Sequence, residues 1–300
     1  MPASPPHGSR GPGALNAWLR PSMPMERGRL AVLAVLALLT IATWGLTVRQ
    51  ARTMEMPMGI VARGGSDEAM AGMAGMAASG MAGMTEAWSW DGFAAFVVAW
   101  AVMMAAMMFP AAAPMLLLFH RASTRRRAHG DAFVPTWVFA GGYLLVWTAV
   151  GVLTWAAVAS GSDLVGRMGA GDRATWGPLA LGVTLAVAGL YQLTPLKRVC
   201  LDHCRSPMGF VMQHWREGYS GALRMGLVHG AYCLGCCWAL FVVLVAAGVM
   251  SLAWMALLTL VVFIEKVLPV GPRAAQVTGA ALLVLGAVVA AGVIGMPWTA

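Results

Sequence analysis

Charged residues are scarce in this sequence. Asp, Glu, Lys and Arg make up 11% of the 300 residues, whereas soluble domains carry about one quarter. Hydrophobic residues make up 59%, and the mean hydropathy is +0.73. Several apolar runs reach the length of about 20 residues that a bilayer-spanning helix needs. The shortage of charge therefore excludes an ordinary soluble domain and predicts an all-α fold, a polytopic transmembrane helix bundle.

Several familiar motifs are missing as well. The sequence contains no P-loop, no G-x-S-x-G, no H-E-x-x-H and no dinucleotide-binding fingerprint, so nothing indicates ATP-driven transport or an enzyme. The net charge of +8 comes mostly from Arg in short connections, which indicates membrane topology and no nucleic-acid partner. Five Cys is an odd number, and three lie in one apolar segment, which disfavours a disulfide framework.

Seven apolar stretches are predicted to span the membrane, with a six-span core behind an N-terminal anchor helix. They cover residues 30–48, 93–119, 134–160, 176–193, 221–250, 251–268 and 274–294. We expect the anchor to stay uncleaved, because no A-x-A-type site follows it and its apolar run is long for a signal peptide. The predicted domains are a disordered cytoplasmic N-terminus (1–29), the anchor helix (30–48), a Met-rich outer loop (49–92) and a metal-binding transmembrane domain (93–296).

Basic residues predict the orientation in the membrane. Arg and Lys concentrate in the N-terminus and in the connections 120–133, 194–220 and 266–273, which the positive-inside rule places in the cytoplasm. The N-terminus is then cytoplasmic, the C-terminus is outside, and the protein lies in a bacterial inner membrane. Arg49 and Arg52 are the exception, because they follow the first span on its outer side.

The stretch HGAYCLGCCW, residues 229–238, places one His and three Cys within the fifth span. On an α-helix that turns about 100° per residue, these side chains and one preceding Met fall within one third of the circumference. The group consists of Met225, His229, Cys233, Cys236 and Cys237. Soft sulfur ligands favour Cu(I), and thiolate with imidazole also suits zinc. The alternative is that small Cys and Gly side chains only allow close helix packing.

Methionines form two further candidate groups. Four lie in the second span as pairs at i, i+4, which either direct two thioethers at one ion or fill gaps in the core. These four are Met103, Met104, Met107 and Met108. Pro110 and Pro114 should bend this helix. The outer loop allows three interpretations: a weak collector of Cu(I), a low-complexity spacer, or a helix that lies on the membrane surface. Its methionines are Met70, Met73, Met76, Met81 and Met84.

Two polar groups complete the candidate set. The motif CLDHC, with Cys200, His203 and Cys204, forms either a three-ligand soft site in the cytoplasm or an ordinary loop with idle Cys. Glu265, near the end of the sixth span, either faces the bundle interior and assists the fifth-span ligands or reaches the interface together with Lys266.

Four segments, taken in order, resemble one known family. WAVMMAAMMFPAAAPM, YQLTPLKRVCLDHCRSP, GLVHGAYCLGCCWAL and FIEKVLP are similar to segments of a bacterial family of predicted metal-binding integral membrane proteins, over about residues 88–290. Some members of that family are linked to the supply of copper to polyphenol oxidases. The resemblance implies metal binding and brings no catalytic residues with it.

The leading hypothesis is therefore Cu(I) handling, either transport or delivery to a copper enzyme, with zinc as the alternative metal. The expected partners are membrane lipid, the metal ion, and a cuproenzyme or copper chaperone, while the oligomeric state is open. Two other hypotheses stay open. One is a membrane thiol–disulfide carrier that uses the C-x-x-C of Cys233 and Cys236 with Cys200 and Cys204 as partner pair. The other is a structural assembly factor that binds no metal.

Overall fold

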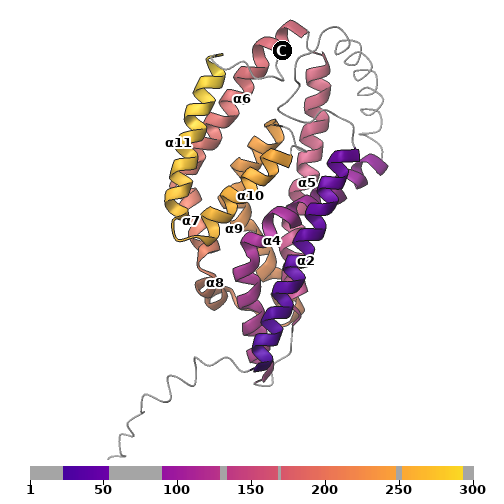
Figure 1. Cartoon of the computed structure of the whole chain (residues 1–300), viewed down its shortest axis with the longest axis vertical. Coiled ribbons are helices and arrows are strands. Elements are labelled where there is room, and N and C mark those ends of the chain that lie inside the picture. The colour runs from indigo at the N-terminus through magenta and orange to yellow at the C-terminus, as the bar shows by residue number, and fades with distance from the viewer. Residues whose placement is uncertain (1–22, 54–89, 129–133, 168–169, 248–251, 293–300) are drawn as a thin grey trace, which may run out of the picture.

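A computed structural model describes residues 23–53, 90–128, 134–167, 170–247 and 252–292, and every structural statement below concerns these residues. The secondary-structure elements of these residues are all helices, which confirms the predicted all-α bundle (Figure 1). The long helices are α2 (Met23–Thr53), α4 (Trp90–Ala128), α5 (Thr136–Arg167), α6 (Ala170–Leu193), α9 (Gly218–Ala247) and α11 (Gly271–Ala290). The shorter helices are α7 (Pro195–Arg205), α8 (Pro207–His214) and α10 (Leu252–Val267).

Six helices of the described residues are long and apolar enough to cross a membrane, namely α2, α4, α5, α6, α9 and α11. The predicted span at 251–268 corresponds to α10, whose 16 residues extend about 24 Å and fall short of the hydrocarbon thickness of about 30 Å. Large apolar side chains are exposed on the outer faces of the bundle, as Leu38 and Val277 illustrate. Such a surface is compatible with lipid contact.

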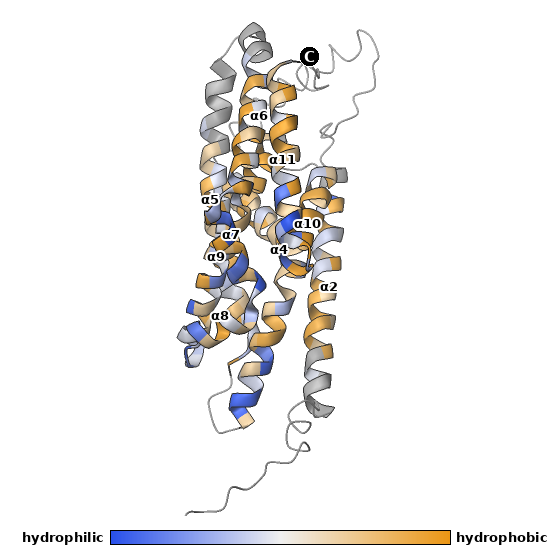
Figure 2. Ribbon diagram, turned by 90° about the vertical axis from the view of Figure 1, so that its left-hand side faces the viewer, coloured by the Kyte–Doolittle hydropathy of each residue, from blue (hydrophilic) through white to orange (hydrophobic). Residues whose placement is uncertain are grey.

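Helices α6 and α11 pack as a close pair, side by side in both views (Figures 1 and 2). Each carries two glycines seven residues apart, which places both on one face of the helix. A Cβ atom at Gly189 would lie 2.7 Å from the carbonyl oxygen of Gly279, and one at Gly286 would lie 2.6 Å from that of Gly182. The two backbones therefore touch in a way that only glycine permits.

A second backbone contact joins α5 to α9. Gly142 of α5 faces the carbonyl of Leu223, and Gly226 of α9 faces the carbonyl of Phe139. Because neither glycine has a side chain, the two helices approach closely here. The contact brings Tyr143 against α9, where the candidate ligands lie.

Helix α4 is longer than the predicted span. It continues through Pro110 and Pro114 and ends at Ala128, so the Arg-rich segment after residue 119 belongs to the helix and not to a loop. Its last turn carries three basic side chains, Arg125, Arg126 and Arg127. The ribbon of α4 is coloured hydrophilic at its lower end in Figure 2.

The connection 194–220 is not the simple polar loop that the sequence predicted. Thr194 caps α7 by accepting a hydrogen bond from the backbone of Lys197, and Ser206 separates α7 from α8. Helix α7 packs against α9, with Leu201 and the Lys197 side chain fully buried. Figure 2 shows the hydrophilic residues of α7 and α10 level with apolar stretches of neighbouring helices. Polar side chains of this connection thus enter the bundle.

Candidate metal centre

Helix α9 supplies three buried thiols. Cys233, Cys236 and Cys237 are each 1% exposed, and none of them is in a disulfide. The thiols of Cys236 and Cys237 donate to the carbonyl oxygen of Cys233 at 3.1 and 2.8 Å. Residues at i, i+3 and i+4 share one face of an α-helix, so the three thiols lie on the face that the helical projection indicated.

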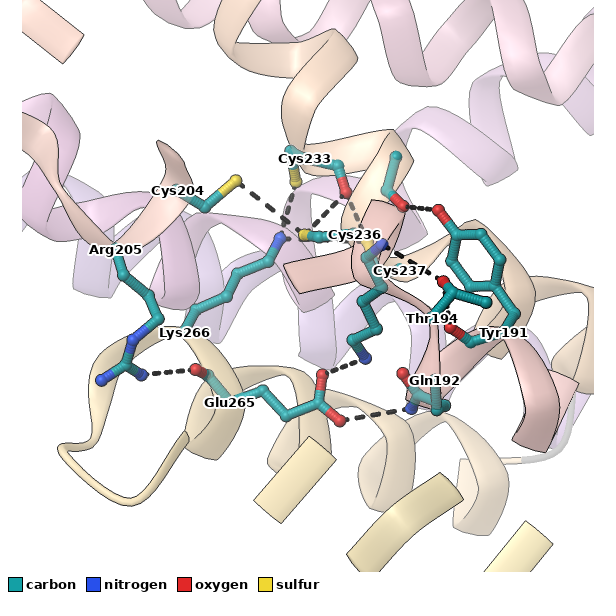
Figure 3. Close-up of polar contacts among 12 residues, drawn as sticks. Tyr191, Gln192, Thr194, Cys204, Arg205, Cys233, Cys236, Cys237, Glu265 and Lys266 are labelled. Carbon is teal, nitrogen blue, oxygen red and sulfur yellow. Dashed lines mark hydrogen bonds and ion pairs between the residues drawn. The ribbon is translucent and has the colours of Figure 1, made fainter. Parts of the chain in front are cut away.

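A fourth thiol reaches this group from α7. The Sγ atom of Cys204 lies 3.9 Å from the Sγ of Cys236, as Figure 3 shows. The helices approach closely here because Gly235 has no side chain: a Cβ atom there would lie 2.8 Å from the Sγ of Cys200. From the sequence, the α7 cysteines and the α9 cysteines were predicted to form two different sites. The structure instead places Cys204 next to the α9 group.

The two α7 cysteines keep their protons at neutral pH. The hydrogen bond with Cys236, followed by burial, raises the pKa of the Cys204 thiol well above its ordinary value. Burial also raises the pKa of Cys200. A metal ion that binds to Cys204 must therefore displace its proton.

A thioether and a phenol complete the surroundings of Cys233. Its thiol lies 4.0 Å from the Sδ atom of Met108 on α4 and 2.9 Å from the Tyr143 hydroxyl on α5. An ion between two sulfur atoms at about 2.3 Å from each, the usual metal–thiolate distance, separates them by up to about 4.6 Å. The pairs Cys204–Cys236 and Cys233–Met108 are close to that separation.

Helix α10 adds an ammonium group to the cluster of thiols. The Nζ atom of Lys266 lies 2.7 Å from the Sγ of Cys233 and 3.9 Å from the Sγ of Cys237. The residue is only 8% exposed. Lys266 therefore faces the bundle interior and does not extend to the surface, the placement that the sequence offered for it together with Glu265. We call Cys204, Cys233, Cys236, Cys237, Met108 and Lys266 the sulfur cluster.

Glu265 is buried as well, but it points away from the thiols. Its carboxylate accepts from the Lys197 ammonium at 2.6 Å and from the Gln192 amide at 3.2 Å. The guanidinium of Arg205 donates to the backbone carbonyl of Glu265 at 2.6 Å (Figure 3) and to that of Leu268 at 2.7 Å. These contacts fasten α7 to α10, so Glu265 supports the site instead of contributing an oxygen ligand.

His229, predicted as a ligand, lies in an aromatic pocket. Its ring packs against Phe139, Tyr143 and Phe210 at centroid distances of 5.8, 5.7 and 5.3 Å. The side chain is 3% exposed, and its Nδ1 atom has no hydrogen-bond partner among the residues that the structure describes. The structure brings His229 next to the phenol that contacts Cys233, and not into a hydrogen bond with a thiol.

His203 of the CLDHC motif is also directed away from the thiols. Its ring stacks on Tyr232 at a centroid distance of 4.2 Å, and its Nδ1 lies 2.8 Å from the carbonyl oxygen of Val199. The three-ligand site predicted for this motif is therefore divided. Cys204 joins the sulfur cluster, Cys200 contacts Gly235, and His203 stacks on the surface of α9.

The predicted methionine ligands are buried where the structure describes them. All of those on α4 and α9 are at most 4% exposed, and they are Met103, Met104, Met107, Met108 and Met225. Among them Met108 contacts a thiol. Met73 and Met76, like the rest of the Met-rich loop, lie outside the described residues.

The described residues hold no group of three or more His, Cys, Asp or Glu side chains already arranged around a metal position. A preformed four-ligand zinc site is therefore absent from this part of the chain. The cluster instead offers two sulfur pairs, and soft sulfur ligands are those that select Cu(I).

Comparison with known families agrees with this chemistry. A family model described as PpoB2, copper chaperone, matches residues 97–289. The chain belongs to this family of copper chaperones. No curated protein and no solved structure matches the chain.

The match to the copper chaperone family spans the whole sulfur cluster, from Met108 on α4 to Lys266 on α10, and excludes α2. It agrees with the resemblance to copper-supplying proteins seen in the sequence motifs.

Two residues that contact the Cys233 thiol, Lys266 and Tyr143, were not predicted as site residues from the sequence. Lys266 had a usable signal, because an ionisable residue in an apolar helix is a functional candidate by default. Tyr143 had none, since its role depends on how α5 packs against α9.

Proposed function

We propose that this copper chaperone is an integral protein of the bacterial inner membrane that binds Cu(I) at the sulfur cluster and passes it to a copper enzyme. The observation that carries the proposal is the pair of thiols on separate helices, Cys204 and Cys236, with Sγ atoms 3.9 Å apart. The neighbouring Cys233–Met108 pair, at 4.0 Å, supports it. Two soft donors serve Cu(I), whereas a structural zinc site needs four ligands.

A route for the ion follows from the order of the soft ligands. The Met-rich loop with Met73 and Met76 collects Cu(I) on the outer side, and the buried thioethers of α4 relay it to the sulfur cluster. Thioethers bind Cu(I) through weak, neutral sulfur, which suits sites from which an ion must leave again. Cys204 lies on α7, which is part of the basic connection 194–220 predicted to be cytoplasmic, so ions can also exchange on that side.

The site is tested by anaerobic Cu(I) titration of the purified protein in detergent against a chromophoric Cu(I) chelator. The double variant Cys204→Ser/Cys236→Ser should lose at least about 100-fold in affinity, because loss of an outer-shell partner alone costs about 10–100-fold. Cys200→Ser is the matched control from the same helix and should bind within about threefold of the wild type. An unchanged affinity in the double variant would remove the basis of the proposal.

The thiol–disulfide carrier is a weaker candidate. In the C-x-x-C, the Cys236 thiol donates to the carbonyl oxygen of Cys233 at 3.1 Å. Cys236 also has a thiol neighbour outside the C-x-x-C, because its Sγ lies 3.9 Å from that of Cys204. The family is named for copper and not for redox chemistry. We therefore favour copper delivery.

A further inference from the structure

The lysines of this chain are few and both are buried. Lys197 and Lys266 are the two lysines of the sequence, at 0% and 8% exposure. Lys197 forms an ion pair with the carboxylate of Glu265, with 2.6 Å between Nζ and Oε2. That carboxylate also accepts from Gln192, so both of its oxygens are engaged. The charge of Lys197 is thus compensated without any part of the sulfur cluster.

Lys266 is placed differently. Its Nζ contacts within the described residues are to the thiols of Cys233 and Cys237, at 2.7 and 3.9 Å (Figure 3). An uncompensated buried charge is costly, by several kcal/mol per ion after relaxation. Among the described contacts of Lys266, the thiols are the groups that can supply a compensating negative charge, and they gain it when a bound ion displaces their protons.

The charge balance of the loaded site follows from simple addition. A Cu⁺ ion bound by two thiolates forms a unit of charge −1, because each thiol gives its proton to water as the ion enters. With the Lys266 ammonium, which contacts Cys233 and Cys237 of the same cluster, the total charge of the site is zero. Without that ammonium the same unit is a buried anion, which a low-dielectric interior disfavours.

A divalent ion fits this arrangement poorly. Bound by the same two thiolates beside the ammonium, it leaves a net charge of +1. A third thiolate of the cluster would restore neutrality, but the four thiols are not gathered around one point: among the described residues no three His, Cys, Asp or Glu side chains are grouped so as to hold one ion. Ions such as Zn(II) also require four donors in a closed site.

We propose that Lys266 is the residue that adapts the sulfur cluster to a monovalent soft cation, Cu(I) or Ag(I), held by two thiolates. This inference rests on the proposed function, since it assumes that the cluster binds the cargo. Lys266 acts through charge and does not bind the ion, so it is a specificity-determining residue and not a ligand.

The experiment measures affinities for Cu(I) and for Cd(II), a soft divalent probe, on the full-length protein under anaerobic conditions. Lys266→Met should weaken Cu(I) binding at least about tenfold, which corresponds to about 1.4 kcal/mol, while Cd(II) affinity stays equal or rises. Lys266→Arg keeps the charge and should stay within about threefold of the wild type for both ions. Lys266→Gln, neutral but able to donate a hydrogen bond, replaces the Met variant if that variant does not fold.

The outcomes separate the two proposals. Equal Cu(I) affinity in the neutral variants and the wild type overturns the role of Lys266, and so does an equal loss for Cu(I) and Cd(II), which would indicate a merely structural effect. An Arg variant as weak as the neutral variants overturns it as well. In each of these cases the wild type still binds Cu(I), whereas a wild type that fails to bind Cu(I) overturns the proposed function itself.

Discussion

The missing side chain at Gly235 decides how closely Cys204 can approach Cys236. Gly235 immediately precedes Cys236 on α9, and its open face receives the Sγ atom of Cys200. Cys200 and Cys204 are four residues apart and share one face of α7. Displacing Cys200 therefore displaces Cys204 in the same direction.

Gly235→Ala should weaken Cu(I) binding by about tenfold, because the added methyl group lies 2.8 Å from the Cys200 sulfur and must push α7 outward. The second change Cys200→Ala removes that sulfur and leaves the Cys200 Cβ at 3.5 Å, an ordinary contact. The double variant should return to within about threefold of the wild type in the same titration. A double variant as weak as Gly235→Ala would assign Cys200 to the ligands and contradict this account.

The positions of individual side chains could be predicted from the sequence where the geometry is local. The spacing of Cys233, Cys236 and Cys237 determines their shared face, because the helical repeat alone fixes it. The same projection put His229 on that face, but it could not predict that Phe139 and Phe210 enclose the imidazole. The approach of Lys266 to Cys233 depends on how two helices pack, which no local repeat encodes.

At the scale of the elements, α7 is held in place by α10. The buried ion pair between Lys197 and Glu265 and the Arg205 contacts to the end of α10 join the two helices. Hydropathy predicted the long helices, but it assigned 194–220 to the solvent because this segment is polar. Lys197 of this segment is buried in an ion pair with Glu265 of α10, and such pairing is a long-range property that composition does not reveal.

Removing one partner of this buried ion pair should destabilise the protein strongly. Lys197→Met leaves the Glu265 carboxylate uncompensated and should lower the free energy of unfolding by about 3–5 kcal/mol. Lys197→Met/Glu265→Gln leaves no unpaired charge and should recover much of that loss. Thermal unfolding in detergent measures both variants. Equal destabilisation of the single and double variants would show that the unpaired Glu265 carboxylate is not the source of the loss.

For the whole molecule, the arrangement of basic residues predicts the orientation. The start of α2 and the Arg-rich end of α4 lie at one end of the bundle, and α11 ends at the other (Figures 1 and 2). The positive-inside rule places the first of these ends in the cytoplasm. Alkaline phosphatase fused to the C-terminus should therefore be active, and a fluorescent protein fused to the N-terminus should fold and fluoresce. An inactive C-terminal fusion with normal expression would reverse the proposed topology.

The position of Cys236 near the middle of α9 has an electrical consequence. If α9 crosses the membrane as proposed, the thiols lie at mid-depth, and a bare Cu⁺ ion that reaches them crosses about half of the membrane voltage. That is about 1 kcal/mol per 100 mV, because a full crossing by one charge is worth about 2.3 kcal/mol. Once bound beside Lys266, the ion belongs to a neutral unit on which the field exerts no net force. Voltage therefore acts on the entry and exit of copper, while movements of the loaded site are electrically silent.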